Sequence, residues 1–169
     1  MGKNMDLAEI LNTIYQKLAK EITDAYYNDE IDYILEKYDL KDEVSYSYYD
    51  SNNAKILIVG NSMISKDIMV SIAKKYGIKE DRLEFELDYD RLHNYNFGNL
   101  QNNMSYSDVL VGPLPHKVRG IENYNSFLAM AEANPDEFPK IIRLEGSNEL
   151  KITKQSFLDG LLKTRLYND

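Results

Sequence analysis

The sequence of 169 residues contains no cysteine and no tryptophan. The missing cysteine excludes disulfide scaffolds, thiolate zinc sites, iron–sulfur clusters and cysteine nucleophiles, and it fits a reducing compartment. The chain also lacks a long uncharged apolar run and the three-part pattern of a signal peptide, so we expect a cytoplasmic protein that does not enter a membrane. A chain of this length is long enough to build one domain with a small extension, without disulfides or metal.

Basic residues are scarce, with 20 Lys and Arg against 28 Asp and Glu, a formal charge of −8. Nucleic acids and anionic membranes attract positive surfaces, so neither is expected as a partner. Residues 1–53 hold 5 basic and 12 acidic side chains, a net −7, together with eight of the 14 tyrosines. The composition changes at the turn formers Asp50, Ser51, Asn52 and Asn53. The sequence therefore predicts an acidic, tyrosine-rich extension over 1–53 and a second domain over 54–169.

Apolar residues at spacings of three and four predict a helix over residues 6–26. A second, shorter helix is expected to begin at Asn28 or Asp29 and to turn Ile31, Ile34, Leu35 and Tyr38 inward. Residues 44–49 alternate briefly like a strand. Two interpretations remain open: the extension packs on the rest of the protein, or its apolar stripe and tyrosines form a homodimer or partner interface.

Residues 54–169 alternate between the patterns of buried strands and of helices. Strands are predicted at 55–60, 82–88, 108–112 and 140–144, the second of them at a sheet edge because acids alternate with its apolar residues. Helices are predicted after a cap at Ser65, closing at Gly77; after Asn123 or Asn125, ending at 134–135; and from Thr153 to Leu166. Residues 90–107 are predicted to hold a short helix or a mobile flap. The alternation indicates an α/β fold, a three-layer Rossmann-like domain with a four-stranded parallel sheet of order 2-1-3-4.

Ligands of open α/β sheets bind at the carboxyl ends of the strands, and the loop after the first strand is one candidate site there. Gly60, Asn61, Ser62 and Ser65 form a small-residue loop that leads into a helix. Free backbone N–H groups at such a helix start favour phosphate or carboxylate, and the serines would add hydroxyl donors. The G-x-G-x-x-G and P-loop fingerprints are both missing. The alternative is an ordinary strand-to-helix turn with a serine cap.

The loop after the third strand is the second candidate site. Gly112 begins a proline-stiffened loop with His116, Lys117 and Arg119, three potential cations in an otherwise acidic chain. The only other histidine, His93, follows the second strand and is expected on the same rim. Asp88, with Asp90 beside it, lies where nucleotide binders carry a ribose-binding acid. Two histidines are too few to predict a metal site, and no cofactor is expected. The alternative is an ordinary turn whose basic side chains face solvent.

The strand at residues 55–60, the serine-containing loop to Ser65, and residues 107–113 with their Gly-Pro turn together resemble the IIB subunits of the lactose/cellobiose sugar phosphotransferase type. The resemblance implies a four-stranded parallel sheet with a phosphate loop after its first strand. The family's phosphorylated cysteine would fall at Gly60, so phosphotransferase activity does not carry over. Low-molecular-weight tyrosine phosphatases need the same thiolate. The layout is also similar to uncharacterised bacterial Rossmann-like domains, and the fold is the shared element.

Three functions remain as hypotheses. The first is a binding or sensing module for a small anion, a nucleotide or sugar phosphate, held between the Gly60 and His116 loops. The second is a hydrolase or transferase that acts on a phosphoester or glycosidic bond, with His116 as general acid or base oriented by Asp88 or Asp90. The third is a ligand-free interaction or inhibitor module.

Overall fold

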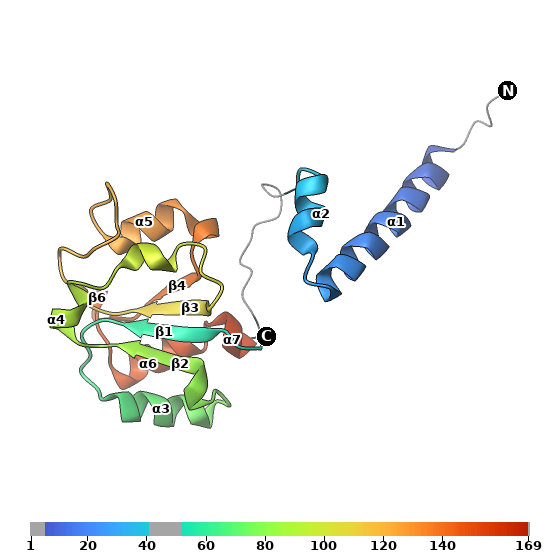
Figure 1. Cartoon of the computed structure of the whole chain (residues 1–169). Helices are drawn as coiled ribbons and strands as arrows, with labels where there is room; N and C mark the ends of the chain where they lie inside the picture. Colours follow the sequence, from blue (N-terminus) through green and yellow to red (C-terminus); the bar gives the residue numbers. More distant parts are fainter. Residues whose placement is uncertain (1–5, 41–51, 169) are drawn as a thin grey trace. The chain divides into compact units, whose positions relative to one another are not determined.

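A computed structural model describes residues 6–40 and 52–168 of the chain. The chain separates into two compact units, residues 1–45 and 46–169, which Figure 1 shows as a helical unit and a sheet-containing unit. The division predicted between residues 53 and 54 lies eight residues further along the chain. The strand predicted at 44–49 lies outside the described residues.

The first unit is a pair of helices, α1 (Leu7–Tyr27) and α2 (Ile31–Lys37). Asp6 caps α1 by accepting a hydrogen bond from the backbone N–H of Ala8 at 3.4 Å. The predicted caps of the second helix are wrong. Asn28 is the C-cap of α1, and Asp29 has φ +58°, the left-handed conformation of a residue that reverses the chain. The helix therefore starts two residues later than Asp29, after Glu30, whose side chain makes no capping hydrogen bond.

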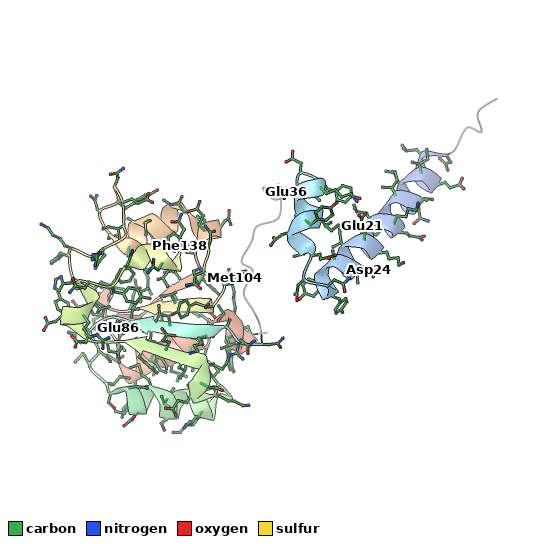
Figure 2. The ribbon with its side chains drawn as sticks, viewed as in Figure 1. Glu21, Asp24, Glu36, Glu86, Met104 and Phe138 are labelled. Carbon is green, nitrogen blue, oxygen red and sulfur yellow. The ribbon has the colours of Figure 1, made fainter. Side chains whose placement is uncertain are left out.

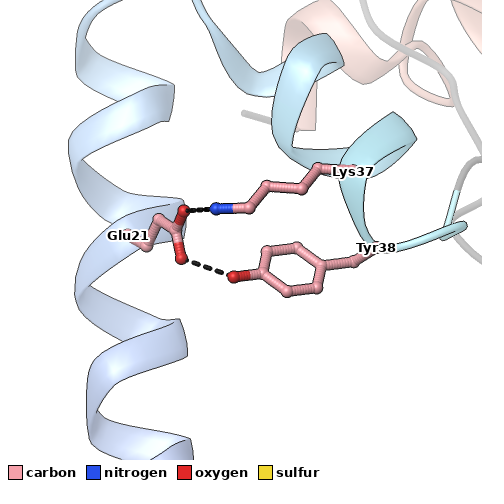
Figure 3. A network of polar contacts seen from close by, with 3 residues as sticks. All are labelled: Glu21, Lys37 and Tyr38. Atoms are coloured by element: carbon pink, nitrogen blue, oxygen red, sulfur yellow. Dashed lines mark hydrogen bonds and ion pairs between the residues drawn. The ribbon is translucent and has the colours of Figure 1, made fainter.

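The two helices meet along a short apolar contact and one polar network. Ile34 and Leu35 of α2 and Ala25 of α1 are buried. The Glu21 carboxylate accepts hydrogen bonds from the Lys37 ammonium at 2.5 Å and from the Tyr38 hydroxyl at 2.6 Å, as Figure 3 shows. Both interactions lower the pKa of Glu21, that with Lys37 the more strongly. Because Tyr38 follows the last residue of α2, the end of α2 lies beside Glu21, in the second half of α1.

The second unit is built on a four-stranded parallel sheet in the order β2-β1-β3-β4, as predicted. Its strands are β1 (Lys55–Val59), β2 (Leu83–Glu86), β3 (Tyr106–Val111) and β4 (Lys140–Arg143). In the central strands, β1 is buried from Ile56 and β3 from Ser107. This burial is why both read as continuous apolar runs. The alternating strand β2 lies at the edge, also as predicted.

Helices cover both faces of the sheet (Figure 1). Helices α3 (Lys66–Lys75) and α6 (Lys154–Leu161) lie on one face, and α5 (Phe127–Ala133) lies on the other. The shorter elements are α4 (Tyr89–Leu92), α7 (Arg165–Asn168), three 3₁₀ turns (Glu80–Arg82, Phe97–Leu100 and Pro135–Glu137), and a hairpin of β5 (Glu145–Gly146) with β6 (Glu149–Leu150). The hairpin has no counterpart among the predicted elements.

Helix ends follow the predicted caps at three positions. Ser65 caps α3, Thr153 caps α6, and Gly77 takes φ +82° after α3. The cap predicted for α5 at Asn123 or Asn125 is wrong, because Ser126 accepts the hydrogen bond from Ala129 N–H at 3.1 Å. Ser65, Thr153 and Ser126 satisfy N–H groups that a helix start leaves without internal partners, whereas Gly77 donates its own N–H to the Lys74 carbonyl at 3.2 Å.

Helix α6 ends at Leu161, whereas the sequence predicted a single helix from Thr153 to Leu166. The hydroxyl of buried Thr164 donates to the Leu161 carbonyl at 2.7 Å, and a new helix, α7, begins at Arg165. The carboxylate of Asp108 in β3 accepts hydrogen bonds from the backbone N–H groups of Arg165 at 2.8 Å and Leu166 at 3.3 Å. This distant carboxylate fixes the break, because it satisfies the N–H groups that a new helix start exposes.

Residues 90–107 form a packed segment. Leu92, Phe97 and Leu100 are completely or almost completely buried against the face of the sheet that α5 also covers. Of the two predictions for this segment, the short helix is therefore confirmed, with α4 and the turn at Phe97–Leu100 as its helical parts. Among the helices that the structure describes, none combines the length and the apolar character needed to cross a membrane.

Candidate functional site

The carboxyl ends of β1 and β3 lie in direct backbone contact. A Cβ atom added to Gly60 would stand 2.7 Å from the carbonyl carbon of Gly112, and Gly60 has φ +132°. A Cβ on Gly112 would in turn meet the Ile152 side chain at 2.4 Å. The two glycines therefore serve the close packing of the strand ends, and the Gly60 position favours glycine on conformational grounds as well.

Many polar groups of the loop after β1 are hydrogen-bonded to other groups of the protein. The backbone N–H of Gly60 bonds the Glu86 carbonyl at 3.1 Å, that of Asn61 the Pro113 carbonyl at 2.8 Å, and that of Met63 the Ile152 carbonyl at 3.1 Å. Within the loop, the Ser62 hydroxyl accepts from Ile64 N–H and donates to the Ile64 carbonyl. The expected row of free N–H groups is thus not present at these four positions, and the loop resembles the ordinary serine-capped turn.

Two side chains at the start of α3 also disfavour strong anion binding by that loop alone. Ser65 uses its hydroxyl to cap α3 by accepting from Ile68 N–H at 3.4 Å. Asp67 occupies the first helical turn, where its carboxylate already complements the positive end of the helix dipole. Asn61 and Ser65 remain exposed at the rim, available to a ligand by their side chains only.

The loop after β3 presents its predicted cations to solvent. His116, Lys117 and Arg119 are all exposed. Among the residues that the structure describes, no ion pair involves Lys117 or Arg119. Their charges are therefore not neutralised by any acid in the described parts of the chain.

The segment that follows β2 is bonded to this loop. The Phe97 N–H donates to the Arg119 carbonyl at 3.0 Å, and Asn96 forms a parallel bridge with Arg119. The His93 Nδ1 lies 3.3 Å from the Lys117 carbonyl oxygen, and the His93 ring stacks edge-on against Tyr89. His93 thus lies beside the loop that bears the other histidine, as the sequence suggested. Exposed Arg91 adds a further cation close by in the chain, paired with Glu86 at 3.8 Å.

Asp88 has a structural task at the end of β2. Its carboxylate accepts hydrogen bonds from the backbone N–H groups of Asp90 at 2.9 Å and Arg91 at 3.3 Å, and so caps α4. An orienting acid for a catalytic histidine would instead bond the imidazole ring. The hydrogen-bond contact of the His93 ring is with a backbone carbonyl. Among the residues that the structure describes, neither Asp88 nor Asp90 is hydrogen-bonded to the ring of His116, the proposed general acid or base.

The amino ends of the strands hold a second polar group, which sequence reasoning did not single out. The Tyr106 hydroxyl donates to Glu84 at 2.8 Å, and the Lys55 ammonium lies 3.8 Å from the same carboxylate. These three residues line a hollow of about 560 Å³, together with Asn53, Ala54, Met104 and Ser105. In Figure 2, Met104 at this hollow and Glu86 at the carboxyl end of β2 lie toward opposite ends of the strands.

Two tyrosines near Glu84, Tyr95 and Tyr106, have pKa values above the ordinary value of tyrosine. Burial raises the pKa of Tyr95 to about 12, with the charges of Glu84 and Glu86 adding to the effect. Burial, followed by the hydrogen bond to Glu84, also raises the pKa of Tyr106. The Tyr106 phenol donates its hydrogen bond to Glu84, an arrangement that suits structure better than acid–base chemistry. In the sequence, only the alternating acids Glu84 and Glu86 pointed to this polar group, and such a pair is typical of the solvent-exposed face of any edge strand.

Within residues 6–40 and 52–168, no group of three or more His, Asp or Glu side chains gathers in a way that would hold a metal ion. Comparison of the chain with protein-family models, with curated proteins and with solved structures gives no match. The case for a function therefore rests on the chain's own residues.

Proposed function

We propose that the α/β unit binds a small anionic molecule, a nucleotide or a sugar phosphate, at the carboxyl ends of its strands. The observation that carries this proposal is the joining of two segments that bear exposed basic side chains. The loop with His116, Lys117 and Arg119 is bonded to the segment with His93 through the Lys117 and Arg119 carbonyls.

Charge is the first support for an anionic ligand. Residues 54–169 hold 15 basic and 16 acidic side chains, so this part is nearly neutral and a local excess of cations stands out. Lys117 and Arg119 form no ion pair within the described parts of the chain. Unpaired lysine and arginine attract phosphate, and arginine can bind two of its oxygens at once.

Rigidity is the second support. Pro113 and Pro115 restrict the loop, Pro115 is buried, and the loop is tied to neighbouring segments through the carbonyls of Pro113 and Arg119. A loop already held in place loses less conformational entropy when it binds a ligand. We propose that side chains contact the ligand, those of Asn61 and Ser65 included, because much of the backbone of the Gly60 loop is already hydrogen-bonded.

The test is calorimetric titration of the full chain with a small panel of probes: ATP, AMP, glucose 6-phosphate and inorganic phosphate. The informative variant is Lys117→Ala/Arg119→Ala. A matched control, Lys75→Ala/Lys79→Ala, removes two exposed lysines from the end of α3 and the loop after it, at the amino edge of the sheet. We expect at least one organic phosphate to bind, and the first variant to bind it roughly tenfold more weakly for each charge-assisted hydrogen bond lost.

Two outcomes contradict the proposal. If none of the four probes binds, the α/β unit is not a module for this ligand class. If a probe binds equally well to the wild type and to the Lys117→Ala/Arg119→Ala variant, the ligand lies elsewhere. Binding that weakens equally in both variants would indicate attraction to general positive charge and would also refute the assignment.

A further inference from the structure

The first half of α1 carries an apolar stripe that the described residues leave open. Leu7, Leu11 and Ile14 are 68%, 58% and 56% exposed. Burial increases along the second half of the helix: Leu18 keeps part of its surface exposed, Ile22 is half-buried, and Ala25 is buried. We call Leu7, Leu11, Ile14 and Leu18 the open stripe.

The spacing of the open stripe is that of a coiled-coil seam. Its members follow one another at intervals of four, three and four residues, which places Leu7 and Ile14 at d positions and Leu11 and Leu18 at a positions of a heptad. Glu21 takes the next d position, and there it bonds Lys37 and Tyr38 of α2. The seam for an outside helix therefore ends where the chain's own second helix begins to cover α1.

Charge along the unit is separated from the open stripe. Between residues 7 and 18 there is one acid, Glu9, and one base, Lys17. Residues 21–39 contain seven acidic side chains and one basic side chain. The apolar end of the unit is thus nearly neutral, and its acidic excess is concentrated at the other end.

We infer that the open stripe binds the same stripe of a second copy of this chain, with the two α1 helices antiparallel. In this arrangement Leu7 faces Leu18 of the second copy and Leu11 faces its Ile14, so each a position meets a d position. The contact is the same on both copies, as a twofold dimer requires.

Electrostatics decides the orientation. With the helices antiparallel, the two Glu21 positions are about 25 Å apart at 1.5 Å per residue, well beyond the screening length of about 8 Å at physiological salt. With the helices parallel, the two acidic ends would lie side by side and repel. A partner helix with an acidic end of its own is therefore accepted in only one direction.

The contact is short, and this sets its strength. The open stripe spans about 16 Å along the helix, so the area it buries falls below the ~1,200 Å² of a typical stable interface. We expect a dimer with a dissociation constant on the order of micromolar or weaker, so the dimer population depends on protein concentration.

The experiment is sedimentation equilibrium of the full chain from low to high micromolar concentration. Leu11→Glu/Ile14→Glu adds two charges to the open stripe, and Asn12→Glu/Gln16→Glu adds two charges to exposed positions of the same helix away from the seam. The wild type and the second variant should show the same concentration-dependent dimer, and the first variant should stay monomeric. Circular dichroism of both variants checks that α1 keeps its helicity.

Orientation is read from cross-linking, which is clean because the chain has no cysteine of its own. An oxidised mixture of the Leu7→Cys and Leu18→Cys variants should yield the mixed disulfide dimer in excess over either self-pair. An excess of Leu7-to-Leu7 pairs would overturn the antiparallel arrangement. A wild type that is monomeric at every concentration would overturn the proposal as a whole, whether the stripe packs on the chain's own α/β unit or serves another protein.

Discussion

The carboxylate of Asp108 provides the sharpest test of how the fold is held together. Asp108 is completely buried at the start of β3, and it accepts three hydrogen bonds: from the Ser107 hydroxyl at 2.6 Å and from the backbone N–H groups of Arg165 and Leu166. Replacing it by alanine leaves two N–H groups at the start of α7 without their acceptor. A donor stranded in this way costs about 1–3 kcal/mol, so for the two N–H groups we expect Asp108→Ala to lower the free energy of unfolding by roughly 2–6 kcal/mol.

That loss is a large part of the roughly 5–15 kcal/mol by which domains are stable. With a slope of roughly 2 kcal/mol per molar urea, a loss of 3 kcal/mol moves the unfolding midpoint of the α/β unit down by about 1.5 M. Asp108→Asn keeps the volume and one acceptor oxygen and should fall between the wild type and alanine. Asp81→Ala, at an exposed aspartate, is the matched control and should change stability by less than about 0.5 kcal/mol.

Two measurements check the reasoning on Asp108. Urea unfolding followed by circular dichroism gives the midpoints, and amide hydrogen exchange reports the Arg165 and Leu166 N–H groups directly. Both amides should exchange faster in Asp108→Ala. If Asp108→Ala unfolds at the same urea concentration as Asp81→Ala, or if the two amides keep their protection, the carboxylate does not anchor α7 and the explanation of the break after Leu161 is wrong.

Two further predictions concern the strand ends and the tyrosines. Gly60→Ala should destabilise the protein by roughly 1–3 kcal/mol more than Gly77→Ala, because both glycines have positive φ but only a Cβ on Gly60 meets backbone, and chemical denaturation of the two variants compares them. Stability should fall as pH rises above 10: the folded state holds the Tyr95 proton with a pKa of about 12, so its contribution is complete below the unfolded pKa of 10 and is lost as pH passes through the folded value. Thermal unfolding between pH 9 and 12 tests this, and Tyr95→Phe should reduce the slope; an unchanged slope would contradict it.

The sheet and most helix ends were predictable because their causes are local in sequence. A run such as Ile56 to Val59 is apolar because both faces of β1 are covered, and the alternation in β2 reflects its place at the edge. Ser65 and Thr153 cap the helices that follow them by bonding N–H groups three residues onward. Each signal and its structural consequence lie within a few positions of one another.

The features that escaped prediction depend on contacts between distant positions. The N–H groups that bond Asp108 come from residues 57 and 58 positions later, so its sequence neighbours reveal only an apolar strand. The contact between His93 and the Lys117 carbonyl spans 24 positions, and only the shared strand-end rim pointed to it. At α5, Asn123, Asn125 and Ser126 are all competent caps, and Ser126 caps the helix that starts with the buried Phe127.

The acidic excess of the chain separates the two proposals. Of the formal charge of −8, residues 1–53 carry −7, so the strongest repulsion between two copies acts at the end of α1 remote from the open stripe. The α/β unit is nearly neutral and presents Lys117 and Arg119 without ion pairs among the described residues. Anion binding and self-association thus draw on different residues and different forces: raising the salt concentration should weaken the first by screening, and should leave or strengthen the second because its contact is apolar and its acids repel. If both proposals hold, a salt series on the wild type should weaken anion binding measured by calorimetry and should not weaken the dimer measured by sedimentation.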